Sequence, residues 1–241
     1  MSGLSTDATE SLSEDPLDAV LFDIDGTLCE YERTIADLLT VAFDRTGVEP
    51  FFSAADYKAR FNTFTNESAD VDTLRERCFA DIAVEYGRDP DLCRDIARAY
   101  ATERDHSRVR WLDGSREVLD AFDADYRLAA VTNGGPGMQS QKLDALGVDC
   151  FETVVHAGYD TPAKPDPRPF EVALAAVETP PERALYIGDS VEADIAGARN
   201  AGLRVAWLSH DRTDPTPTPD FTLDSPAELL DRPWRGSETL D

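Results

Sequence analysis

Lysine is almost absent from the sequence, and its scarcity argues against one class of partner. Among 241 residues it occurs only as Lys58, Lys142 and Lys164, and the 23 basic residues face 48 acidic ones, which gives a net charge of −25. A protein that binds nucleic acid over a broad area needs a clustered basic face. We therefore expect no nucleic-acid surface on this protein.

Cysteine and histidine are also scarce, and neither forms a metal or disulfide pattern. The cysteines are Cys29, Cys78, Cys93 and Cys150. They contain no C-x-x-C pair and no nearby histidine at metal-ligand spacing, so we expect buried or reduced thiols rather than a zinc site or a disulfide framework. The histidines are isolated, and we expect no ligand role for them: His106, His156 and His210.

Long hydrophobic runs are missing as well. No apolar stretch approaches the ~20 residues that a membrane-spanning helix needs. Residues 1–15 are rich in Ser, Thr, Asp and Glu without a basic start or an apolar core, so we expect a disordered tail and no signal peptide there. With 41% hydrophobic and 29% charged residues, the composition predicts a globular protein of the cytoplasm.

The acidic residues are spread along the whole chain, and nearly all the basic residues are arginine. High salt screens the mutual repulsion of such an acidic surface. A lysine-poor, acidic composition is typical of a halophile, and we predict that source. The alternative is an acidic protein from an ordinary cell.

One stretch, residues 20–28, carries the strongest chemical signal. It begins with a short apolar run that suits a strand buried on both faces. Asp23 and Asp25 follow two residues apart, so in an extended chain they point the same way. Their repulsion has to be relieved by a cation, a shared proton or a nearby Lys or Arg. The alternative is a strand end with solvated acids and an ordinary Asp-Gly turn at Gly26.

The order of apolar patterns indicates an α/β protein with an insertion. Spacings of three and four predict helices over 35–43, 51–66, 71–86 and 90–106. Further along, short apolar runs predict strands over 128–131, 153–155, 184–187, 205–208 and 221–223. Helices are predicted between and after these strands, over 116–122, 139–146, 169–177, 191–201 and 226–230. Strands that alternate with helices indicate βαβ units and a parallel sheet.

We therefore predict a Rossmann-like parallel sheet core with helices on both faces. Residues 16–28 and 109–232 are expected to form this core. Residues 29–108 are expected to form an inserted helical cap, and residues 233–241 a tail.

Parallel α/β sheets bind ligands at the carboxyl ends of their strands, so the polar residues that close the apolar runs are expected to meet. They include Asp23, Asp25, Thr132, Asn133, Lys164, Asp189 and Asp194. The carboxylates of Asp23, Asp189 and Asp194 suit a hard dication such as Mg²⁺. Thr132, the amides around Asn133 and the charge of Lys164 suit a phosphoryl group.

Each of these signals has a plain structural alternative when it is taken alone. Residues 132–134 could be a simple turn. Lys164 could be a solvated loop lysine, although it lies between prolines in a chain with few lysines. Asp189 and Asp194 could stabilise a helix N-terminus. Their occurrence together, in order and at strand ends, favours the site.

Four motifs make the chain resemble the haloacid dehalogenase (HAD) superfamily. They are DIDGTL at 23–28, VTNG at 131–134, AKPD at 163–166 and GDSVEAD at 188–194, in the family's order. The resemblance covers about residues 18–231. It implies that Asp23 is the nucleophile that becomes an aspartyl-phosphate and that Asp25 is the general acid and base.

The same resemblance implies the binding groups. Thr132 and Lys164 would bind the phosphoryl group, and Mg²⁺ would be held by Asp23, the Asp25 backbone carbonyl and Asp189, with support from Asp194. The helical insertion would be the family's mobile C1 cap. The dehalogenase branch usually lacks an acid at the position of Asp25, so the resemblance favours a phosphatase.

The substrate is predicted only as a small phosphate monoester: a nucleotide, a sugar phosphate or phosphoglycolate. Residues 131–143 look most like the branch with pyrimidine nucleotide and acylneuraminate phosphate phosphatases. In the cap six residues could face the site, although helix surface or bundle core is favoured for each: Glu30, Tyr31, Arg33, Phe61, Phe64 and Arg75. A phosphomutase or a 2-haloacid dehalogenase is the alternative, whereas a non-catalytic binding protein is disfavoured because no motif acid is missing.

Overall fold

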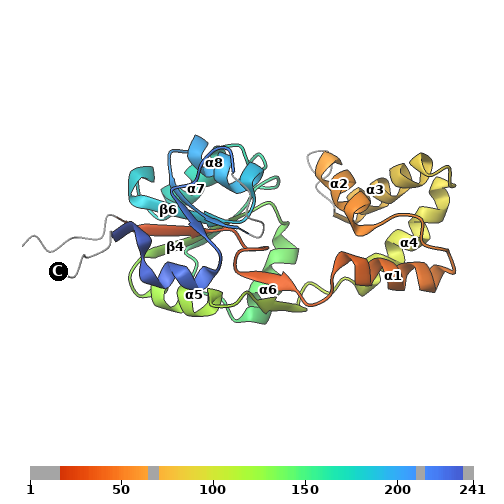
Figure 1. The fold of residues 1–241 in the computed structure, drawn as a ribbon, viewed down its shortest axis with the longest axis horizontal. Helices are drawn as coiled ribbons and strands as arrows, with labels where there is room; N and C mark the ends of the chain where they lie inside the picture. Colours follow the sequence, from red (N-terminus) through yellow and green to blue (C-terminus); the bar gives the residue numbers. More distant parts are fainter. Residues whose placement is uncertain (1–16, 65–70, 210–214, 236–241) are drawn as a thin grey trace, which may run out of the picture.

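The computed structural model describes residues 17–64, 71–209 and 215–235. The predicted tail at 1–15 and His210 lie outside these residues. Figure 1 shows two parts side by side: a sheet covered by helices, and a separate group of helices joined to it by two connections. No helix in the described part of the chain combines the length and apolarity needed to cross a membrane.

The sheet has six strands, all parallel, in the order β5-β4-β1-β6-β7-β8. Their bounds are Ala19–Phe22 for β1, Arg127–Thr132 for β4, Thr153–His156 for β5, Ala184–Gly188 for β6, Arg204–Leu208 for β7 and Phe221–Leu223 for β8. Strand β1 lies at the centre, where Val20 pairs with Leu128 on one side and Leu185 on the other. The predicted α/β fold with a parallel sheet is confirmed.

Both faces of the sheet are buried, as the continuous apolar runs require. On one face Val20 and Phe22 pack with Phe122, under the helices α5 (Ser115–Asp123) and α6 (Pro136–Leu146). On the other face Leu21 packs with Phe170, under α7 (Arg168–Ala176) and α8 (Ala196–Asn200). Alternate residues of β1 therefore serve opposite halves of the core.

Helices α1 to α4 form the second part, here called the helical lobe. Their bounds are Ile35–Thr46, Ala54–Phe64, Val71–Glu85 and Pro90–Glu103. Helix α1 begins with a reciprocal capping box between Thr34 and Asp37 and ends at Gly47, which has φ of 67°. The lobe has an aromatic core of its own, in which Phe79 contacts Phe52 and Tyr100.

A small two-stranded sheet, which the sequence does not predict, joins the two parts. Strand β2 (Cys29–Tyr31) pairs antiparallel with β3 (Val109–Trp111), so Cys29 lies opposite Trp111. The chain leaves the core along β2 and returns along β3 (Figure 1). This pairing holds the two connections to the lobe side by side.

Three predictions near the carboxyl terminus need correction. Residues 191–201 form not one helix but a π-helical turn, η3 (Val191–Ile195), followed by α8. The predicted helix at 226–230 is the 3-10 helix η4 (Pro226–Asp231). Residues 233–235 are not tail: they form the 3-10 helix η5, and Trp234 is buried with its ring 5.7 Å from that of Phe122.

Candidate active site

The carboxyl ends of the central strands place the predicted site residues together. Asp23 directly follows β1, Thr132 is the last residue of β4, and Asp189 directly follows β6. Lys164 reaches the same place from the loop between β5 and α7. The convergence follows from the parallel order of the strands.

Lys164 is the centre of a buried polar cluster. Its Nζ donates to Asp23 Oδ1 at 2.8 Å and to Asp194 Oδ1 at 2.6 Å. The same nitrogen lies 2.9 Å from both the Val131 carbonyl oxygen and the Tyr186 hydroxyl. The side chains of Lys164, Asp23 and Asp194 are 2%, 8% and 1% exposed, respectively. Water therefore does little to screen these charges, and the cluster stabilises a fixed geometry.

Burial and charge shift the ionisation of this cluster. Burial raises the pKa of Asp23 well above its ordinary value; Lys164 opposes this rise, and Asp194 and Asp189 add to it. Burial lowers the pKa of Lys164, but Asp194 and Asp23 raise it, and the net shift is upward. The cluster therefore contains one lysine and three carboxylates. This excess of negative charge favours the binding of a further cation.

Asp25 has different surroundings. Its carboxylate oxygens lie 2.5 and 2.6 Å from the Nζ of Lys142, and one of them accepts a hydrogen bond of 2.8 Å from Gln139 Nε2. Both partners come from α6 and are buried, whereas the Asp25 side chain is 42% exposed. A different lysine therefore neutralises each acid of the motif. Of the two acids, only Asp25 has a substantially exposed side chain.

Thr132 is joined to Asp25 through Gln139, whose Nε2 donates to both. Its Oγ1 accepts hydrogen bonds from Gln139 Nε2 at 2.9 Å and from the Gly134 backbone amide at 3.0 Å. A hydroxyl oxygen has two acceptor sites and one donor proton. These two bonds occupy the acceptor sites, so the O–H of Thr132 is left to donate.

Asn133 holds the loop that carries Lys164. Its side-chain Nδ2 donates to the Lys164 carbonyl oxygen at 3.2 Å, and its Oδ1 accepts from the Lys164 amide at 2.9 Å. This reciprocal pair fastens the loop to the end of β4. The side chain of Asn133 thus fixes the position of the Lys164 backbone. Asn133 also lines the cavity described below.

Glycines make room for two of the acids. Gly26 has φ of 80°, and a Cβ on it would collide with the Asp189 carboxylate. A Cβ on Gly188 would lie 2.5 Å from the carboxyl carbon of Asp194. Any side chain at either glycine would therefore push a carboxylate out of the cluster.

The residues present fit a hard dication. Carboxylate oxygens of Asp23, Asp189 and Asp194 lie within 4.8 Å of one another, and oxygen ligands suit Mg²⁺. Asp194 is already engaged, because Oδ1 accepts from Lys164 and Tyr186 and Oδ2 accepts from the Ser190 amide. Asp23 and Asp189 are thus better placed to bind an ion directly.

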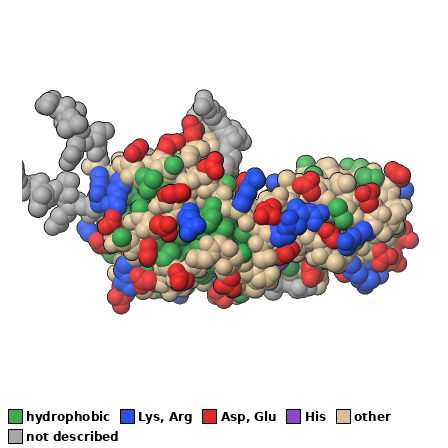
Figure 2. All heavy atoms as spheres, turned by 90° about the horizontal axis from the view of Figure 1, so that it is seen from below, with side chains coloured by type: hydrophobic (Ala, Val, Ile, Leu, Met, Phe, Trp, Pro, Cys, Tyr) green, Lys and Arg blue, Asp and Glu red, His purple; other side chains and the backbone are tan. Residues whose placement is uncertain are grey.

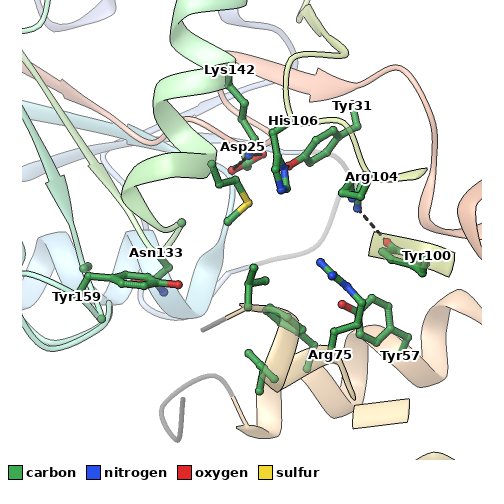
Figure 3. A pocket seen from close by; sticks show the side chains of 17 residues that line it. Asp25, Tyr31, Tyr57, Arg75, Tyr100, Arg104, His106, Asn133, Lys142 and Tyr159 are labelled. Atoms are coloured by element: carbon green, nitrogen blue, oxygen red, sulfur yellow. Dashed lines mark hydrogen bonds and ion pairs between the residues drawn. The ribbon is translucent and has the colours of Figure 1, made fainter. Parts of the chain in front are cut away.

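A cavity of about 270 Å³ opens between the core and the helical lobe. Its core side includes Asp25, Lys142 and Tyr159, and its lobe side includes Arg75 and Arg104 (Figure 3). Asp25 therefore separates the buried cluster around Lys164 from a space large enough for a small molecule.

The structure shows where the six candidate residues of the predicted cap lie. Tyr31, Phe61 and Arg75 line the cavity, although surface or bundle core was favoured for each. The other three lie elsewhere: Glu30 pairs with Arg110, Arg33 pairs with Glu103, and Phe64 packs against the Arg77 guanidinium.

His106 is not isolated, contrary to the expectation from sequence. Its Nδ1 lies 2.7 Å from the Tyr31 hydroxyl, and its ring lines the cavity. Burial, followed by the positive charges of Lys142, Arg104 and Arg75, lowers the pKa of His106 to about 4. His106 is therefore neutral near pH 7.

Three residues of the site are not predicted from the sequence: Gln139, Lys142 and Tyr186. A usable signal existed for the first two, because they are three residues apart on one helix face and Lys142 is one of only three lysines. Tyr186 gave no such signal, since a buried tyrosine in a strand is indistinguishable from core.

A protein-family model described as haloacid dehalogenase-like hydrolase matches residues 17–202. The chain is 34% identical to the phosphoserine phosphatase of Thermus thermophilus over 160 residues, which is 65% of this chain and 64% of that protein. It is 35% identical to the glyceraldehyde 3-phosphate phosphatase of Pyrococcus abyssi over 42% of this chain and 44% of that protein. The matches thus span less than two thirds of these relatives.

Longer but weaker similarities cover nearly the whole chain. The glyceraldehyde 3-phosphate phosphatase of Methanopyrus kandleri is 28% identical over 88% of this chain and 95% of its own. The crystal structure of the HAD-hydrolase YfnB from Bacillus subtilis, bound to magnesium, superposes with a TM-score of 0.73 and 24% identity, over 90% of this chain and 98% of that one. This likeness confirms the fold.

Proposed function

The chain belongs to the haloacid dehalogenase-like hydrolases, and from this premise we propose that it is a Mg²⁺-dependent phosphatase that hydrolyses a small phosphate monoester. The observation that supports the reaction most is the pair of unlike acids. Asp23 is buried beside Lys164, and Asp25 is half exposed and faces the cavity. One suits attack on phosphorus and the other suits proton transfer.

In the proposed reaction, Asp23 attacks the phosphorus atom and the bond to the leaving oxygen breaks. Asp25 gives a proton to that oxygen, then takes one from the water that attacks the aspartyl-phosphate. The second attack releases inorganic phosphate and restores the Asp23 carboxylate. Lys142 and Gln139 hold Asp25 in place during both steps.

The phosphoryl oxygens carry negative charge that the site has to meet. Thr132 has an O–H to donate, because its acceptor sites are occupied by Gln139 and by the Gly134 amide. Lys164 stabilises the carboxylate form of Asp23 through their ion pair of 2.8 Å. These groups are fixed before substrate arrives, which reduces the cost of reorganisation.

Asp23 and Asp189 would hold Mg²⁺, together with the Asp25 backbone carbonyl, and Asp194 would support them. When bound, the ion would neutralise charge on the phosphoryl group. The three clustered carboxylates and the upward pKa shift of Asp23 support this assignment.

We also propose that residues 29–108 act as a C1-type cap over the site. The helical lobe has its own core and joins the sheet through β2 and β3 alone among the described strands. Its residues form one wall of the cavity. Substrate selection would therefore lie in the lobe.

A phosphate-release screen over a panel of phosphate monoesters, in molar KCl with and without Mg²⁺, tests the proposal. We expect release from at least one ester, loss of release with EDTA, and recovery when Mg²⁺ is restored. Asp189→Asn should raise the Mg²⁺ concentration needed for half-maximal release by about 10-fold or more. The folded protein showing no metal-dependent release from any ester would refute the proposal.

Lys142→Met should lower kcat by about 100-fold, because Asp25 would lose the group that orients it. KM should change little, since the phosphoryl-binding groups stay in place. Lys142→Arg should restore part of kcat, and Lys58→Met on the exposed face of α2 is the matched control. Steady-state kinetics on one ester measures all three; an unchanged kcat in Lys142→Met would remove Lys142 from the positioning role.

The cytoplasmic and halophilic assignments also remain proposals. Figure 2 shows Asp and Glu side chains scattered over this face of both parts of the molecule, with basic side chains between them. At a net charge of −25, salt should stabilise the fold by screening repulsion. We expect the midpoint of thermal unfolding to rise between low and molar KCl; a constant midpoint would count against a halophilic source.

A further inference from the structure

Arg75 is a buried cation that faces the cavity. Its side chain, on α3, is only 4% exposed, and its Nε has no hydrogen-bond partner among the described residues. Nη1 pairs at 2.5 Å with Asp72, whose own side chain is 66% exposed. In Figure 3 the guanidinium points into the cavity beside Tyr57. A buried donor left unpaired is costly, so this arrangement is poised for an acceptor.

Arg104 adds a second guanidinium to the same wall. It follows the last turn of α4, lies 3.9 Å over the centre of the Tyr31 ring and donates to the Tyr100 hydroxyl at 3.1 Å. No carboxylate pairs with it in the part of the chain that the structure describes. The aromatic contacts fix its position while leaving its charge unmatched.

The cavity is positive although the protein is strongly acidic. Asp25 is the acidic residue among the described residues of its lining, and Lys142 already balances that charge. Arg75 has only the exposed Asp72 as an acidic partner, and Arg104 has none among the described residues, so the lining carries an excess of positive charge. The lowered pKa of His106 has the same origin in part, since both arginines disfavour its protonated form. In a chain with a net charge of −25, such a place concentrates anions.

Arg75 and Arg104, here called the positive wall of the cavity, are distinct from the groups proposed to bind the phosphoryl group. Thr132, Lys164 and Asp23 lie at the strand ends and do not line the cavity, whereas Arg75 and Arg104 belong to the lobe. Asp25, the proposed acid for the leaving oxygen, stands between them. The leaving alcohol would therefore extend from Asp25 toward the two arginines.

We propose, on the basis of the phosphatase function above, that the substrate carries a second anionic oxygen group on its alcohol part and that Arg75 and Arg104 bind it. A carboxylate or a second phosphate matches the fork of a guanidinium. The cavity of about 270 Å³ limits the substrate to a small metabolite. Arg75 is thus a specificity-determining residue.

A neutral nucleobase fits the cavity less well. It would leave the buried Nε of Arg75 without an acceptor and the Arg104 guanidinium without an anionic partner among the described residues. The aromatic rings of the lobe are also engaged, because Tyr57 makes edge contacts with Phe79 and Tyr100 inside the lobe core. Tyr57 and Tyr100 therefore line the cavity with rings that already pack against each other.

Pairs of esters that differ in one group test the inference. 3-Phosphoglycerate is compared with glycerol 3-phosphate, which has a hydroxymethyl group in place of the carboxylate. Propane-1,3-diol bisphosphate is compared with the monophosphate to separate a phosphate from a carboxylate. We expect kcat/KM to be about 10- to 100-fold higher for one anionic member, the size of one charge-assisted hydrogen-bonded contact.

Variants assign this preference to the arginines. Arg75→Gln and, independently, Arg104→Gln should each reduce the ratio of kcat/KM between the members of the preferred pair by about 10-fold or more, mainly through KM. Arg75→Lys should restore part of the ratio. Arg77→Gln is the matched control on the same helix, since the Arg77 guanidinium lies over Phe64, and it should leave the ratio unchanged.

The outcomes separate this inference from the function on which it rests. Release of phosphate from neutral and anionic esters at equal kcat/KM would overturn the inference and leave the phosphatase standing. A preference that survives both arginine variants, or a preference for a nucleoside monophosphate over every small anionic ester, would also overturn it. Failure to hydrolyse any ester with Mg²⁺ would overturn the proposed function first.

Discussion

Asp23→Asn is expected to lower kcat by about four orders of magnitude or more while the protein stays folded. The amide has nearly the shape of the carboxylate but cannot attack phosphorus. Lys164 keeps Asp194 as a partner at 2.6 Å, so the buried cluster does not lose its charge balance. Phosphate release measures the loss, and circular dichroism with thermal unfolding measures the fold.

The matched control is Asp123→Asn, at an exposed position on α5. It removes the same charge from the protein but lies outside the site, and it should retain full activity. Near-normal turnover in Asp23→Asn would show that another group attacks the substrate. Loss of activity in both variants would show that kcat depends on charge in general.

Lys164→Met is expected to damage both catalysis and stability. Removing one partner of a buried ion pair leaves an uncompensated charge, at a cost of about 3–5 kcal/mol. Here two buried carboxylates, Asp23 and Asp194, lose their shared cation. Activity should fall by about 1000-fold or more, because the charge on Asp23 and the phosphoryl group is no longer met.

Chemical unfolding of Lys164→Met beside Lys58→Met measures this loss, since Lys58 is exposed on α2. The pKa of Asp23 already lies above its ordinary value, and Lys164 is the group that lowers it. Without Lys164 the native state favours the protonated acid more than the unfolded chain does. The stability of the variant relative to wild type should therefore recover as the pH falls. Equal stability of Lys164→Met and Lys58→Met would contradict the role of Lys164 in stabilising the buried cluster.

The sheet and its site residues could be predicted because their signals are local. Each central strand is a short apolar run buried on both faces, and a polar residue ends it or directly follows it. Parallel order then brings Asp23, Thr132 and Asp189 together without further information. Lys164 could be placed because it stands between prolines in a chain with few lysines.

The small sheet and the lobe side of the cavity could not be predicted in this way. Strand β2 has three residues, and its partner β3 lies about eighty positions away, so neither has a pattern of its own. The pairing of Tyr31 with His106 depends on that sheet. Arg75 sits in a helix whose apolar stripe reads as bundle core, and only the packing of the lobe turns it into the cavity.

The environment of the two aspartates of the first motif was also predictable only in part. Their repulsion was evident from spacing, but the manner of its relief was not. In the structure Asp23 pairs with Lys164, and Asp25 pairs with Lys142. Their unlike environments support the roles proposed for them, attack for Asp23 and proton transfer for Asp25.

The most direct measurement of the central claim is the position of the phosphoryl group during turnover. Enzyme that is hydrolysing an ester with Mg²⁺ is quenched in acid, reduced with borohydride and mapped by peptide mass spectrometry. Borohydride converts an aspartyl-phosphate to homoserine, so we predict homoserine in place of Asp23 in the wild type and none in Asp23→Asn. Steady phosphate release with an unmodified Asp23, or with the modification at Asp25 or Asp189, would contradict the mechanism.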